Sequence, residues 1–198
     1  MLLALLCIPF AAALASWFIP ADMPRRFLLL GVSVVELGLA LACWVVEPSS
    51  WGGELLSLDA VGRLVLTITC ILFFAASVYA MGYLKGEDSG TRKDFLQGLH
   101  FSNAPEATFT ACLLLFLASA VLAAFTRHFG VLWVCIETTT IVSAPLIYFH
   151  RHRRSLQATW KYLLIFSVWL ALALMGNLLR DISVQTGAES STGMTVRP

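Results

Sequence analysis

Residues 131–164, VLWVCIETTTIVSAPLIYFHRHRRSLQATWKYLL, place two apolar runs on either side of a short basic turn. Each run extends to about 20 residues, the length of α-helix that crosses ~30 Å of hydrocarbon at 1.5 Å per residue. Neither run alternates apolar and polar residues as a half-buried strand does. Because the turn between them is short, the stretch predicts two transmembrane helices that pack antiparallel.

The rest of the chain repeats this pattern. Of its 198 residues, 59% are hydrophobic and 13% are charged, whereas soluble domains carry about 25% charged residues. Since an α-helix satisfies its own backbone hydrogen bonds in lipid, we expect an all-α integral membrane protein with a bundle of about six transmembrane helices. Residues 181–198 are predicted to form a polar, disordered tail. The helices are expected at residues 2–19, 27–46, 60–84, 107–125, 129–149 and 157–179.

The first apolar run has an alternative interpretation as a secretory signal peptide, because AAALAS offers a small-residue cleavage site. However, no Lys or Arg precedes its apolar core, where a signal peptide carries positive charge. A retained helix is therefore favoured.

Positive charge in the loops orients the bundle. Three loops on one side hold most of the Lys and Arg residues, and cytoplasmic loops carry such an excess. That side is therefore predicted to be cytoplasmic, with the N-terminus outside. The basic residues on this side are Arg25, Arg26, Lys85, Arg92, Lys93, Arg151, Arg153 and Arg154.

Composition argues against several other functions. A net charge of +1 gives no basic footprint for nucleic acid. The five cysteines fall in apolar runs without a CxxC pair, and we interpret them as small buried hydrophobic residues. No flavin, iron–sulfur or nickel ligand pattern is visible, so no cofactor is expected in this chain.

Glu137 lies in the middle of an apolar run, where a charge costs ~3 kcal/mol on insertion scales. Burial favours the neutral acid and a nearby cation favours the ionised form, so such a group can be poised to exchange a proton. Two interpretations stay open, a neutral acid hydrogen-bonded to a neighbouring helix and a proton-carrying site. Thr140 shares its helix face, and the hydroxyls of Thr138, Thr139 and Ser143 could order water nearby.

Three further polar residues are candidates for the same path. Lys161, near the start of the last helix, is either a snorkelling lysine or a modulator of Glu137. Counted from the basic turn, Glu137 is ~22 Å and Lys161 ~10 Å deep, so a direct salt bridge is not expected. Glu36, central in an earlier run, fits equally a proton site or an interhelical hydrogen bond. His128, at the outer mouth, could deliver protons or simply be solvated.

The stretch FGVLWVCIETTTIVSAPLIYFHRHRRSLQATWKYLLIFSVWLALALMGNLL resembles the antiporter-like proton-channel subunits of respiratory complex I. It is most similar to the hydrogenase-4 and formate-hydrogenlyase branch, whose members carry LWV-IE-TT--SA followed by A-WKY-LI-S. The run LDAVGRLVLTITCILFFAASVYAMGYL also resembles the third helix of that family. The resemblance covers most of residues 56–179.

The resemblance implies that Glu137 belongs to a proton path and that Lys161 is the lysine that follows it. It also implies a bacterial inner (plasma) membrane location and an assembly with other membrane subunits. The chain corresponds only to the N-terminal part of such subunits. It lacks their broken seventh helix, whose lysine is the usual partner of the glutamate, so we expect either a split subunit completed by another chain or a truncated one.

Three functions remain in view. The first is a membrane subunit of a complex-I-like or membrane-bound hydrogenase assembly that contributes part of a proton-translocation path, with Glu137 titrating and Lys161 modulating it. The second is an inactive, truncated scaffold or assembly subunit of the same complex, and the third is a small independent oligomeric transporter. In the first two, redox chemistry belongs to partner subunits. This chain would then be at most a non-catalytic subunit of an oxidoreductase of the NADH dehydrogenase or nickel–iron hydrogenase type.

Overall fold

The computed structural model describes residues 1–46, 58–86, 92–93, 100–101, 105–149 and 153–194. They form the helices α1 (Leu2–Phe18), α2 (Asp22–Val45), α3 (Ala60–Gly86), α4 (Glu106–Phe125), α5 (Phe129–Ile147) and α6 (Arg153–Met194). Between α3 and α4, the two-residue strands β1 (Arg92–Lys93) and β2 (His100–Phe101) pair antiparallel. Five of the described helices are long and apolar enough to cross a membrane, and α1 is a shorter apolar helix of 17 residues. The predicted all-α membrane fold class is confirmed.

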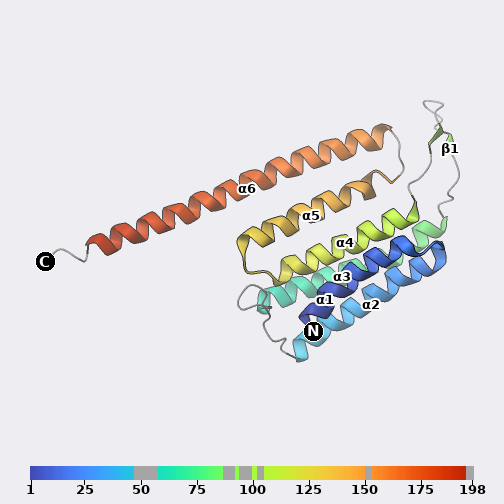
Figure 1. The fold of residues 1–198 in the computed structure, drawn as a ribbon, viewed down its shortest axis with the longest axis horizontal. Helices are drawn as coiled ribbons and strands as arrows, with labels where there is room; N and C mark the ends of the chain where they lie inside the picture. Colours follow the sequence, from blue (N-terminus) through green and yellow to red (C-terminus); the bar gives the residue numbers. More distant parts are fainter. Residues whose placement is uncertain (47–57, 87–91, 94–99, 102–104, 150–152, 195–198) are drawn as a thin grey trace.

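Helices α1 to α5 lie side by side, and α6 extends well beyond them at its C-terminal end (Figure 1). Helix α4 occupies the centre, because it contacts α1, α2, α3 and α5, whereas α6 contacts only α5 among the described elements. The main hydrophobic core draws its residues from α1 to α4. We call the end that carries Arg25 and Arg26 the inner end, because its positive charge predicts a cytoplasmic position, and the opposite end the outer end.

The buried face of α2 shows how the core helices pack. Ser33 Oγ lies 2.8 Å from Ser77 Oγ of α3, and Trp44 Nε1 donates to Thr67 Oγ1 at 2.9 Å. These contacts join α2 and α3 as an antiparallel pair. The buried residues of α2 recur every three or four positions, as expected for one face of an α-helix. They are Arg25, Leu29, Ser33, Glu36, Ala40 and Cys43.

Helix α6 differs from the sequence expectation. The last span was expected to end at residue 179 and a disordered tail was expected from residue 181, but α6 continues to Met194. At 1.5 Å per residue its 42 residues extend about 63 Å, roughly twice the ~30 Å of a hydrocarbon core. Once the apolar part has nucleated a helix, each further residue adds a backbone hydrogen bond at little extra cost. Residues 181–194 contain no proline to stop this growth.

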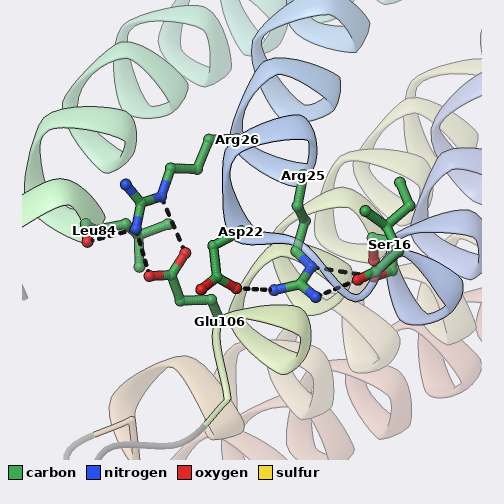
Figure 2. Close-up of polar contacts among 7 residues, drawn as sticks. Ser16, Asp22, Arg25, Arg26, Leu84 and Glu106 are labelled. Atoms are coloured by element: carbon green, nitrogen blue, oxygen red, sulfur yellow. Dashed lines mark hydrogen bonds and ion pairs between the residues drawn. The ribbon is translucent and has the colours of Figure 1, made fainter. Parts of the chain in front are cut away.

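Arg26 joins the inner ends of three helices (Figure 2). Its Nε donates to Glu106 Oε2 at 3.0 Å and its Nη2 to Glu106 Oε1 at 2.6 Å, and Nη2 also donates to the Leu84 carbonyl at 2.9 Å. The Arg26 and Glu106 side chains are only 14% and 9% exposed. The two-point geometry between guanidinium and carboxylate is the strong, directional form of this ion pair. Arg26 thereby fixes the start of α2 against the end of α3 and the start of α4.

Arg25 joins the same end of α2 to α1 (Figure 2). Its Nε donates to the Ser16 carbonyl at 3.2 Å, and its Nη1 pairs with Asp22 Oδ1 at 2.7 Å. It also donates to the Ile19 carbonyl. Both Ser16 and Ile19 belong to the C-terminal end of α1, where carbonyl groups have no partner within the helix. Arg25 therefore satisfies backbone acceptors that would otherwise lie unpaired near the membrane boundary.

At the outer end, Gly62 allows α3 to approach α4 closely. A Cβ at this position would lie 2.7 Å from the Ala124 carbonyl oxygen and 2.9 Å from Asp59 Oδ1. Gly62→Ala should therefore lower the free energy of unfolding by about 1–2 kcal/mol, because one of two backbones must shift. The measurement is denaturant unfolding in mixed micelles. Gly82→Ala on the same helix is the matched control, since a Cβ there meets no atom within 4 Å. An equal response of the two variants would contradict the prediction.

Candidate functional site

Glu137 lies on α5 and faces α6, half-buried between the two helices. Its Oε1 accepts a hydrogen bond from Ser167 Oγ of α6 at 3.1 Å. Its Oε2 is buried and has no hydrogen-bond partner among the described residues. The carboxyl group is thus sheltered by protein and held at one oxygen only.

A second polar contact fixes the register of this helix pair. Ser143 Oγ of α5 lies 2.9 Å from the Tyr162 hydroxyl of α6. Together with the contact between Glu137 and Ser167, it shows that α5 and α6 run antiparallel, as the short turn predicts. Both contacts lie in the seam between α5 and α6, which is the only helix contact that α6 makes within the described structure.

The other hydroxyl groups of α5 do not surround Glu137 as the sequence suggested. Thr138 donates to the Val134 carbonyl at 2.7 Å, and Thr139 and Thr140 donate to the Ile136 carbonyl at 2.7 and 3.1 Å. These bonds are local because a Thr side chain in a helix reaches the carbonyl one turn earlier. Thr140 is buried, and its free lone pairs can still accept a hydrogen bond. The donor hydrogens, however, are used within α5.

Lys161 is exposed on α6 and has no ion-pair partner among the described side chains. On the register set by Tyr162 and Ser167, Lys161 is level with Ala144 of α5. That position is about 10 Å along the helix axis from Glu137. The structure therefore places Lys161 on the same helix pair as Glu137 but beyond contact distance.

His128 is the N-cap residue of α5 and is exposed at the outer end. Its backbone N–H donates to Thr126 Oγ1 at 3.3 Å. Nine residues separate it from Glu137 in the sequence, a rise of about 14 Å along α5. His128 is accordingly at the mouth of this region and does not touch the carboxyl group.

Glu36 is the second carboxyl group in a membrane span. It is 1% exposed, and neither of its oxygens has a hydrogen-bond partner among the described residues. The interhelical hydrogen bond that the sequence allowed is therefore absent among the described residues. Polar bonds between α2 and α3 are made instead by Ser33 with Ser77 and by Trp44 with Thr67. Glu36 is also enclosed more fully than Glu137.

The two carboxyl groups lie at a common depth but in separate places. Each is about 12–14 Å from the outer end of its helix at 1.5 Å per residue. Helix α4 lies between them, since it contacts both α2 and α5 while α2 and α5 do not contact each other. At this level α4 presents Leu114 and Leu117, which are buried and apolar. The described part of the chain thus holds two independent carboxyl sites.

Sequence reasoning missed several polar contacts between helices that the structure contains. Ser167 and Tyr162 are one serine and one tyrosine in an apolar helix, and only the register of α5 and α6 distinguishes them from their neighbours. Glu106 lies one residue before the helix expected at residues 107–125, and it pairs with a residue 80 positions earlier. A polar residue at the first turn of a predicted span is the one signal that could have selected it.

The fold and these side chains define a class, a helical integral membrane protein with two sheltered carboxyl groups at mid-span. No protein-family model matches the chain, and no solved structure matches it. Over 133 residues, or 67% of the chain, it is 25% identical to the hydrogenase-4 component F homolog of Methylacidiphilum infernorum (isolate V4). The match covers 26% of that relative. The chain is therefore similar to about a quarter of a longer protein.

Proposed function

We propose that the chain is a membrane subunit of a hydrogenase-like or complex-I-like assembly and contributes part of a proton-translocation path. Two findings support this proposal, the similarity to a hydrogenase-4 component and the sheltered position of Glu137. The redox chemistry would belong to partner subunits. The other partners would be further membrane subunits of the same assembly. The expected location is the bacterial inner membrane.

The observation that carries the proposal is the state of Glu137. One oxygen is held by Ser167 and the other is buried without a partner among the described residues. A carboxyl group in lipid-facing protein is costly unless something compensates it. A group that is neither fully paired nor fully solvated can take up and release a proton when a nearby charge changes. Glu137 is therefore the proposed titrating group.

Lys161 would act on Glu137 through its electric field. Two unit charges about 10 Å apart interact by roughly 1–2 kcal/mol at an effective dielectric constant of 20. A protonated Lys161 would favour ionised Glu137 by that amount, and a change of charge or position at Lys161 would favour proton uptake. His128 would serve the outer mouth, Thr140 could accept a hydrogen bond beside the path, and Glu36 would form a second site behind α4.

Glu137→Gln tests this proposal in membranes that hold the assembled complex. We expect proton translocation to fall to background while electron transfer between hydrogen and an artificial acceptor is largely kept. Lys161→Gln should reduce translocation only in part, because its contribution is electrostatic and screened. The measurements are fluorescence quenching of a pH-sensitive dye and dye-linked oxidation of hydrogen.

Asp181→Asn is the control, because Asp181 is an exposed carboxylate near the end of the apolar part of α6. It should leave both activities unchanged. Normal proton translocation in Glu137→Gln would exclude the proposed role of Glu137.

A scaffold or assembly role is the second candidate. It is favoured by α6, which contacts only α5 within the described structure and leaves its other faces available to partner subunits. Under this function, deletion of the chain would prevent assembly of the complex, while Glu137→Ala would leave proton translocation intact. The two candidates therefore differ in the response to a single carboxyl substitution.

A further inference from the structure

A groove runs along the seam between α3 and α4. It consists of two adjoining cavities of about 310 and 350 Å³, which share Ala76 and Leu113 in their walls. The inner cavity is also bounded by the end of α5 through Leu146 and Phe149. Small side chains open the groove, because Ala76 and Ala80 of α3 stand where a larger residue would reach α4.

The groove is long enough to span one leaflet of a bilayer. Its walls extend on α3 from Tyr83 at the inner end to Thr69. That distance is about 21 Å at 1.5 Å per residue, against ~15 Å for half of a ~30 Å hydrocarbon core. The groove therefore begins at the inner membrane boundary and ends just beyond the mid-plane.

Aromatic side chains surround the inner mouth of the groove. The rings of Tyr79 and Tyr83 stack with centroids 6.3 Å apart, and Phe109 meets Phe149 edge to face at 5.2 Å. Tyr79 is 75% exposed, so the mouth is open to the side of the bundle. Tyrosine is enriched at the level of lipid headgroups, where its ring is apolar and its hydroxyl is solvated.

We propose that this groove binds one acyl chain of a phospholipid from the inner leaflet, with the glycerol region beside Tyr79. A long cavity without a filling group forfeits the dispersion contacts of its walls, and a linear alkyl chain restores them. Because lipid tails are as apolar as the groove walls, apolarity gives no preference for one acyl chain over the surrounding lipid. The fit of a chain to the shape of the groove is then the basis of its binding. This inference does not depend on the proposed role in proton translocation.

The chemistry of the groove argues against one other occupant. An isoprenoid quinone needs hydrogen-bond partners for its ring oxygens. In the described walls, the polar side-chain groups are the tyrosine hydroxyls at the mouth and Thr69 at the far end.

The test uses the full chain in vesicles of phosphatidylglycerol and phosphatidylethanolamine with trace phospholipids that carry a photoreactive diazirine at one acyl carbon. After illumination, adducts are mapped by mass spectrometry. A diazirine near the headgroup should label Tyr79 and Phe149, and one near the terminal methyl should label Phe116 and Thr69. This depth order needs no substitution and is therefore independent of any effect on folding.

Two tryptophan variants complete the test. Ala76→Trp should fill the groove and lower labelling of its walls by about fivefold, which corresponds to ~1 kcal/mol. Ala75→Trp is the matched control, because Ala75 is an exposed neighbour that lines neither cavity, and it should leave labelling unchanged. Three results would overturn the proposal. Adducts could be spread evenly over all exposed helix faces, or Ala76→Trp could leave the labelling of the groove unchanged. An added quinone could also lower the amount of phospholipid adduct that forms in the groove.

Discussion

Arg26→Ala is expected to lower the free energy of unfolding by about 3–5 kcal/mol, because it leaves the largely buried Glu106 carboxylate without its counter-ion. The substitution removes both donors to Glu106 and the donor to the Leu84 carbonyl. Three helix ends would lose their common contact at once. Denaturant unfolding in mixed micelles, followed by circular dichroism, measures the change.

A double-mutant cycle separates the pair from its surroundings. Glu106→Ala should also destabilise, and the double variant should be less destabilised than the sum of the single ones, because the uncompensated charge is then gone. Arg26→Lys should recover only part of the stability, since lysine keeps the charge but cannot bind both carboxylate oxygens. Arg180→Ala, on an exposed stretch of α6, should stay within about 0.5 kcal/mol of the parent. Additive single effects would show that the ion pair contributes nothing of its own.

This ion pair also shows what sequence reasoning could and could not reach. The all-α membrane class follows from apolar runs that are long enough to cross a bilayer. Each such run can be recognised in the sequence without knowing which helices it contacts. The pairing of Arg26 with Glu106 depends on how α2, α3 and α4 meet, which hydropathy does not encode. From the sequence, Arg26 served only to predict the orientation of the bundle. In the structure, Arg26 donates three hydrogen bonds.

The same limit applies to the candidate site. The depths of Glu137 and Lys161 follow from residue counts along two helices, and these depths predict that the two side chains form no direct salt bridge. The partner of Glu137 could not be predicted, because the sequence does not say whether Ser167 lies on the face of α6 that meets α5. The extension of α6 to Met194 was not predicted, for another reason. The polar composition of residues 181–198 was taken to indicate disorder.

Glu36 is the residue for which the structure changes the interpretation most. The sequence left a structural hydrogen bond and a proton site equally open, and the structure provides no partner for either oxygen among the described residues. Burial of a polar group without a hydrogen bond costs roughly 2–7 kcal/mol, depending on the reference state. A hydrogen bond to one of the described residues therefore does not account for the presence of Glu36.

Glu36→Met is expected to raise the free energy of unfolding by about 2–4 kcal/mol, because it removes an unpaired buried carboxyl group and keeps the side-chain volume. Glu36→Gln is the matched control, since its amide has as many unsatisfied groups in the same space and should bring no such gain. The measurement is the same unfolding titration in mixed micelles. A loss of stability in Glu36→Met would show that the carboxyl group is paired after all.

The proton-translocation activity of Glu36→Met tests why a carboxyl group occupies this position. Residues that lower stability persist where activity requires them, so a stabilised Glu36→Met protein should translocate protons more slowly in the assembled complex. Its effect should add to that of Lys161→Gln if the two carboxyl sites are independent, because apolar residues of α4 separate Glu36 from the pair formed by α5 and α6. A non-additive result would instead mean that protons pass between the two sites through groups that a partner subunit supplies.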